Sequence, residues 1–101
     1  MPECNVTVCN RLGLHARAAA RLVRTASRFT SDIRLERLDR SAAADAKSIL
    51  SVLLLAASRG THLSLRTHGD DEQHAMEALR ELFQCGFGEE VEAQTPLEAG
   101  K

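Results

Sequence analysis

His15 stands where a glycine-containing loop is predicted to become a helix, and Arg17 follows two residues later. The first turn of a helix offers unpaired backbone N–H groups and the positive end of the macrodipole. An anion held there is therefore stabilised both by hydrogen bonds and by the charge of the helix end. A histidine at this point could carry a phosphoryl group on a ring nitrogen, with Arg17 as a second, charged clamp. Spacing alone favours the plainer interpretation of His15 as a helix cap or surface residue. Other features of the chain decide between this interpretation and a phosphoryl carrier.

The size and composition of the chain predict one small domain with an aliphatic core. It has 101 residues, of which 44% are hydrophobic, but only three Phe and no Trp or Tyr. The net charge of −1 argues against a general nucleic-acid or anionic-membrane binder, which needs a basic surplus. Eight Arg and three acids lie between residues 11 and 40, against nine acids and one Arg between residues 70 and 98. This asymmetry favours docking to an acidic protein partner.

The cysteines and the hydropathy predict a reduced, cytoplasmic protein, because no signal segment is visible and the longest apolar run is too short to span a bilayer. A metal site has little support. Cys4 and Cys9 are predicted to face opposite sides of one strand, and His62 and His68 lack a third ligand at a recognised spacing. Cys85 is predicted to be a small core residue of the last helix. We therefore expect no metal and no cofactor.

Hydrophobic periodicity predicts four strands and three helices in the order strand, helix, strand, strand, helix, strand, helix. The strands are expected at residues 5–9, 33–38, 42–45 and 61–67, and the helices at residues 16–29, from 49 onward, and from about 70 to 85. Ser48 is a good N-cap for the second helix, and Gly60 is its expected C-cap. The pattern predicts an α+β layer, one sheet covered on one face.

The first helix is predicted to carry two different faces. A small apolar stripe is expected to lie against the sheet and consists of Ala16, Ala19, Ala20, Val23 and Ala26. The opposite side is expected to present Arg17, Arg21, Arg24 and Arg28. The helix that follows His15 is therefore expected to be strongly basic on its exposed side.

Several stretches in this order resemble the histidine phosphocarrier protein (HPr) family of the bacterial phosphoenolpyruvate-dependent phosphotransferase system. They are Gly13-Leu14-His15-Ala16-Arg17 with Ala19-Ala20, then Ala46-Lys47-Ser48-Ile49, Gly69-Asp70-Asp71-Glu72, and Gly86-Phe87-Gly88-Glu89-Glu90. The last of these looks most like the nitrogen-branch paralogue. The resemblance implies an open-faced, four-stranded antiparallel sheet covered on one face by three helices. We expect this domain at residues 1–90, followed by a polar tail at residues 91–101.

The resemblance also implies a function. His15 would accept a phosphoryl group from a phosphoenolpyruvate-dependent enzyme I and pass it to an enzyme IIA-type protein, while Arg17 stabilises the phosphate. The chain would then be a carrier that is itself a substrate, not an enzyme, and a monomer that docks to two partners in turn. Partner contacts are implied for Ala20, Arg24, Ile49, Leu50 and Leu53. Ser48 would be a regulatory site where an HPr kinase/phosphorylase exists.

The sequence departs from the family pattern at two places. Ala18 stands where the family usually has proline, and the turn at residues 38–41 is longer than the usual tight turn. Alanine restores an N–H donor and loosens the loop–helix junction, so altered transfer rates are expected and not lost function. Two alternatives stay open: a nitrogen-branch carrier that regulates by its phosphorylation state, and a ligand-binding regulatory α+β domain in which His15 is incidental.

Overall fold

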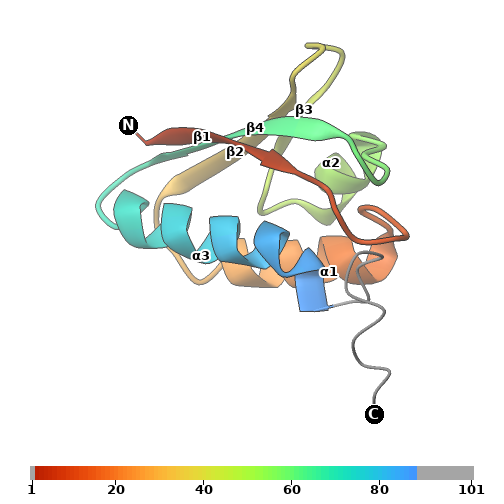
Figure 1. Ribbon diagram of the computed structural model, residues 1–101. Coiled ribbons are helices and arrows are strands. Elements are labelled where there is room, and N and C mark those ends of the chain that lie inside the picture. Colours follow the sequence, from red (N-terminus) through yellow and green to blue (C-terminus); the bar gives the residue numbers. More distant parts are fainter. Residues whose placement is uncertain (1, 89–101) are drawn as a thin grey trace.

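A computed structural model describes residues 2–88 as a sheet with helices on one side (Figure 1). The elements are, in order, β1 (Glu3–Thr7), α1 (Ala16–Ala26), β2 (Asp32–Arg37), β3 (Ala43–Asp45), α2 (Ile49–Leu54), β4 (His62–His68), α3 (Glu72–Gln84) and the short 3-10 helix η1 (Gly86–Gly88). All four strands are antiparallel, in the order β1-β4-β2-β3. The expected open-faced sheet with three helices is confirmed.

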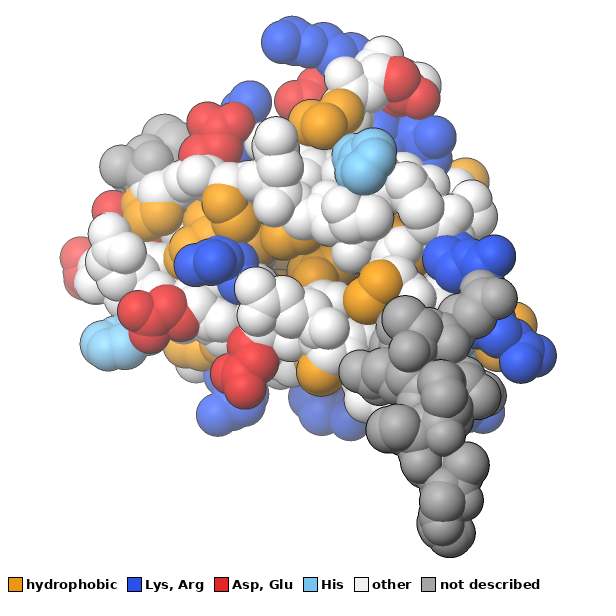
Figure 2. Space-filling model, viewed as in Figure 1, with side chains coloured by type: hydrophobic (Ala, Val, Ile, Leu, Met, Phe, Trp, Pro, Cys, Tyr) orange, Lys and Arg blue, Asp and Glu red, His pale blue; other side chains and the backbone are white. Residues whose placement is uncertain are grey.

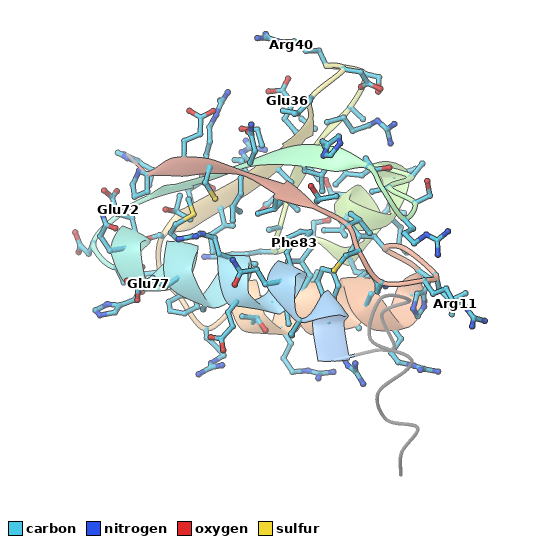
Figure 3. The ribbon with its side chains drawn as sticks, in the orientation of Figure 1. Arg11, Glu36, Arg40, Glu72, Glu77 and Phe83 are labelled. Atoms are coloured by element: carbon cyan, nitrogen blue, oxygen red, sulfur yellow. The ribbon has the colours of Figure 1, made fainter. Side chains whose placement is uncertain are left out.

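The strand register explains why one face of the sheet is polar and the other apolar. Leu65 in β4 pairs with Leu35 in β2, and both side chains are completely buried. Side chains alternate between faces along a strand, so the next residue, Arg66, lies on the open face. There its guanidinium is 3.5 Å from the carboxylate of Glu3 and 3.7 Å from that of Glu36, which Figure 3 shows on the side of the sheet away from the helices.

The core is aliphatic, as predicted, except at the end where the chain leaves α3. There the rings of Phe83 and Phe87 meet edge to face, with centroids 4.9 Å apart. The guanidinium of Arg21 donates a hydrogen bond to the Phe87 carbonyl, so Arg21 ties η1 to α1 and does not simply face solvent. The Gly86-Phe87-Gly88 stretch is therefore a packing device that closes one end of the core.

Two predictions about cysteines are wrong. Cys9 lies beyond the end of β1, so it does not follow the alternation of the strand, and both Cys4 and Cys9 contact α3. The Cys4 sulfur is 3.5 Å from that of Met76, and the Cys9 thiol donates to the Phe83 carbonyl at 3.2 Å. Cys85 is exposed because it is the C-cap of α3, where the helix has already turned away from the core. All three cysteines are free.

The buried face of α1 differs from the predicted stripe. Ala16 is exposed and Val23 is only half-buried, whereas the completely buried residues are Ala18, Ala19, Leu22 and Ala26. The large side chain of Leu22 occupies the core, and the buried face of the helix is therefore rotated relative to the predicted stripe. The helix also ends at Ala26 and not at residue 29.

The expected C-cap of α2 is also wrong. The helix ends at Leu54 with Leu55 as its C-cap, and Gly60 comes later, in the turn before β4. The residue that takes the left-handed conformation after this helix is Ala56, at a φ of 52°. Alanine adopts that conformation only where its surroundings impose it, because its Cβ is crowded there.

No helix within residues 2–88 is long and apolar enough to cross a lipid bilayer. The same residues contain no group of three His, Cys, Asp or Glu side chains placed to hold a metal ion. The expected boundary between a domain at residues 1–90 and a polar tail at residues 91–101 lies outside the described residues.

Asp71 fixes the start of α3 to the loop that follows α1. Its carboxylate accepts hydrogen bonds from the backbone N–H groups of Thr30 and Ser31, each at 3.0 Å, and from the Ser31 hydroxyl. These bonds, the hydroxyl first among them, lower the pKa of Asp71 to about 2. The folded protein thus favours the ionised carboxylate more than the unfolded chain does.

An acid-sensitive contribution to stability is expected from this contact. Because the pKa of Asp71 is lowered on folding, its contribution is complete above the ordinary Asp pKa and is lost as the pH falls toward about 2. Urea unfolding across this range should show a steeper loss of stability in the wild-type protein than in Asp71→Asn. Asp70→Asn, at an exposed neighbouring carboxylate, is the control and should follow the wild type. Parallel profiles for wild type and Asp71→Asn would contradict this assignment.

Candidate functional site

His15 is the N-cap of α1, and one ring nitrogen faces the beginning of the helix. Its backbone is extended, and Nδ1 accepts a hydrogen bond from the Arg17 N–H at 3.3 Å. In a neutral ring this puts the proton on Nε2 and directs the Nδ1 lone pair toward the first-turn amides. The two interpretations of His15 are therefore compatible, because the nitrogen that caps the helix is also the ring nitrogen that faces its positive end.

The loop that carries His15 is held in place by one side-chain and one backbone hydrogen bond. Asn10 Nδ2 donates to the Gly13 carbonyl at 2.7 Å, and the Leu14 N–H donates to the Ala57 carbonyl at 2.9 Å. Gly13 has a φ of +70° and approaches its neighbours so closely that an added Cβ would lie 2.7 Å from the Ala57 oxygen. The histidine thus sits on a fixed loop that rests on the segment following α2.

Two exposed arginines lie on α1, one near each of its ends. Arg17 is exposed in the first turn of α1, and Arg24 is exposed in its last turn. Figure 3 shows Arg11 pointing outward at the end where α1 begins, whereas Glu72 and Glu77 of α3 lie at the opposite end. Arg11 and Arg17 therefore lie at the end of the molecule that carries His15, whereas Glu72 and Glu77 lie at the opposite end.

The helix α2 presents an exposed apolar surface. Ser48 is its N-cap, as predicted, with Oγ accepting the Ser51 N–H at 3.3 Å. Val52 is completely buried, but Ile49, Leu50 and Leu53 are all exposed. This helix packs against α1, so the apolar surface and the basic helix are neighbours. Ala20, the other residue expected to contact partners, is half-buried on α1.

Two further leucines extend the exposed apolar surface and were not singled out from the sequence. Leu12 in the loop before His15 is 66% exposed, and Leu54 at the end of α2 is 70% exposed. A signal for each is present in the sequence. Leu12 lies in a loop between Arg11 and Gly13, and a six-residue helix cannot turn Val52, Leu53 and Leu54 all inward.

His15 lies at the surface of the molecule. Figure 2 shows a hollow between β1 and α3 with a volume of about 220 Å³, and its lining does not include His15. His15 is half-buried beside the exposed Arg17. Ala18, which replaces the usual proline, is completely buried two residues after Ala16, and its effect on transfer rates stays a prediction.

The family model described as "PTS HPr component phosphorylation site" matches residues 2–84. This chain belongs to the HPr family. The phosphocarrier protein HPr of Xylella fastidiosa (strain Temecula1) is 51% identical over 91 residues, which are 90% of this chain and 100% of that protein. The HPr of Pseudomonas aeruginosa is 46% identical over 89 residues, which are 88% of this chain and 98% of that protein.

A solved structure agrees with these relatives. The crystal structure of HPr-C-His from Thermoanaerobacter tengcongensis matches with a TM-score of 0.84 and 42% identity, covering 90% of this chain and 100% of the other. The predicted family and the predicted role are confirmed: this HPr-family chain is a phosphocarrier of the phosphotransferase system and not an enzyme. Its partners are, in general terms, enzyme I and enzyme II components of that system.

Proposed function

We propose that this protein carries the phosphoryl group on Nδ1 of His15. The observation that supports this most strongly is the hydrogen bond from the Arg17 N–H to that nitrogen. In the forward step, the Nδ1 lone pair attacks phosphorus, an N–P bond forms, and the bond from phosphorus to the donor group on enzyme I breaks. The phosphate oxygens then replace the lone pair as acceptors for the first-turn N–H groups, at the positive end of α1.

Arg17 is proposed to stabilise the transferred group. It is exposed in the first turn, so its guanidinium can fold back onto the phosphate oxygens when they arrive. Charge spread over these oxygens during transfer is neutralised by a positioned cation without any further covalent chemistry. An exposed arginine also leaves again at low cost, as the reverse step to an acceptor requires.

The docking surface is proposed to consist of two residues of α1, one of them basic, and of apolar residues of α2. Its members are Ala20, Arg24, Ile49, Leu50 and Leu53. The exposed leucines provide apolar area, and Arg24 favours acidic partners and steers their approach. We propose enzyme I and an enzyme IIA-type component as the two partners that use this surface in turn. Three free cysteines support our placement of this exchange in the cytoplasm.

The test is a two-stage transfer followed by intact mass measurement. The full chain is incubated with phosphoenolpyruvate, magnesium and enzyme I, and then with an excess of a purified enzyme IIA from either the sugar branch or the nitrogen branch. We expect the gain of one acid-labile phosphoryl group and its loss to the acceptor. The faster acceptor identifies the branch. No gain with the cognate enzyme I would favour the ligand-binding alternative, in which His15 is incidental.

Ser48 is proposed as a regulatory site for an HPr kinase/phosphorylase, because a phosphate there would put negative charge beside the exposed leucines of α2. Ser48→Asp keeps a capping oxygen and adds charge, and we expect it to lower kcat/KM for phosphorylation by enzyme I by about tenfold. Ser48→Asn caps equally well without charge and should behave as the wild type. Equal rates for the two variants would refute a charge effect at this position.

A further inference from the structure

The segment after α2 is held by an arginine from β2. Arg37 Nη1 donates to the carbonyl oxygens of Leu55 at 3.0 Å and of Ala56 at 3.2 Å. These carbonyls lie at the C-terminal end of α2, where backbone acceptors are unpaired and a cation is favoured. The Arg37 side chain is only 23% exposed. The Arg37 side chain is therefore held against the segment after α2 and is not a mobile surface charge.

The turn between β2 and β3 fixes the guanidinium of Arg37. The carboxylate of Asp39 accepts hydrogen bonds from Nε and Nη2 of Arg37, all at 3.3 Å. Asp39 is itself oriented by Ser41, whose N–H and hydroxyl donate to it at 2.9 Å and 2.6 Å. Arg40, at the tip of this turn, points away from the body of the molecule in Figure 3. The lengthened turn thus supplies Asp39, which holds Arg37, and Ser41, which orients Asp39.

The carbonyls that Arg37 holds are adjacent to the one that supports His15. Ala56, in its left-handed conformation, is followed by Ala57, whose carbonyl accepts the Leu14 N–H at 2.9 Å. Gly13 packs against the same carbonyl. A shift of the Ala56 backbone is therefore passed to Leu14 and from there to His15. No part of this path needs a contact between Arg37 and the phosphoryl group.

We propose that Arg37 is a positioning residue for phosphoryl transfer. It fixes the carbonyls of Leu55 and Ala56, and this fixes the support of the loop that presents His15. The proposal rests on the proposed function of His15 as the phosphoryl carrier. It adds that the presentation of His15 depends on a side chain from a different part of the sheet.

The experiment compares Arg37→Met, Arg37→Lys and the control Arg34→Met in the full chain. Arg34 is on the same strand but lies exposed, 3.9 Å from Asp32. We measure hydrogen exchange of the Leu14 amide, and kcat and KM for phosphorylation by enzyme I. Arg37→Met should exchange about tenfold faster and lose about tenfold in kcat, with little change in KM, because a misplaced nucleophile slows the chemical step. Lysine should restore part of both losses, and Arg34→Met should match the wild type.

Several outcomes would overturn the proposal. An unchanged hydrogen-exchange rate of the Leu14 amide in Arg37→Met would overturn it, whatever the kinetics show. Faster exchange of that amide together with the kcat of the wild type would also overturn it. If Arg37→Met does not fold, the same two criteria apply to Arg37→Lys, which keeps one charged donor. If the wild-type protein accepts no phosphoryl group from enzyme I, the proposed function of His15 is contradicted. The hydrogen-exchange rates of the Leu14 amide would still show whether Arg37 holds the loop.

Discussion

His15→Ala is expected to take up no phosphoryl group from enzyme I and yet to fold. The substitution removes the ring nitrogen that faces the start of α1. It also removes an N-cap, which costs about 1 kcal/mol, a small part of the stability of a domain of this size. Intact mass after incubation with phosphoenolpyruvate and enzyme I measures the uptake, and thermal unfolding checks the fold.

The other histidines supply the controls for this prediction. His62 contacts Thr7 through Nδ1 at 2.9 Å on the open face of the sheet, and His68 lies 3.9 Å from the carboxylate of Glu72. Neither lies at the start of a helix, so His62→Ala and His68→Ala should be phosphorylated as fully as the wild type. Uptake of a phosphoryl group by a folded His15→Ala protein would contradict the proposal that His15 is the phosphoryl acceptor.

Gly13→Ala is expected to destabilise the protein by about 2–4 kcal/mol and to slow phosphorylation. Part of the loss is the cost of an L-residue at a φ of +70°, about 1–2 kcal/mol. The rest is a clash with backbone that cannot easily retreat, because the new Cβ would lie 2.7 Å from the Ala57 oxygen and 2.8 Å from the Ser58 Cα. Urea unfolding measures the change in the free energy of unfolding, and initial rates with enzyme I measure the effect on His15.

Gly60→Ala separates these two causes. Gly60 also has a positive φ, +91°, but no atom lies within 4 Å of the position of its Cβ. Its substitution should therefore show only the backbone cost, about 1–2 kcal/mol, and leave the phosphorylation rate of the folded protein unchanged. If Gly13→Ala proved no more harmful than Gly60→Ala, the close packing of the His15 loop on Ala57 would not be a constraint.

Features that depend on short-range patterns were predictable from the sequence. The alternation around Leu63 and Leu65 predicted β4, and the position of Ser48 before an apolar run predicted the cap of α2. The placement of His15 at a loop–helix junction followed in the same way from Gly13 and the alanines after it. Local periodicity determines such elements, so their order and the fold class were correct.

Features that depend on contacts between distant segments were not predictable. Cys85 has the spacing of a buried residue, but α3 ends before it. Gly60 looked like the residue that ends α2, whereas Ala56 takes the left-handed conformation with its carbonyl held by Arg37, nineteen positions earlier in the sequence. Arg21 looked solvated, but η1 folds back onto it. For Ala56 and Arg21 the partner is far away along the chain, and no local pattern records it.

The central claim is that the phosphoryl group resides on Nδ1 of His15. It is tested most directly by ¹⁵N and ³¹P NMR of the phosphorylated protein with labelled histidine side chains. We predict a phosphorus–nitrogen coupling at Nδ1 of His15 and unchanged signals from His62, His68 and His74. A coupling at Nε2 would mean that the helix start does not hold the phosphate, and a coupling at any other histidine would show that His15 is not the carrier.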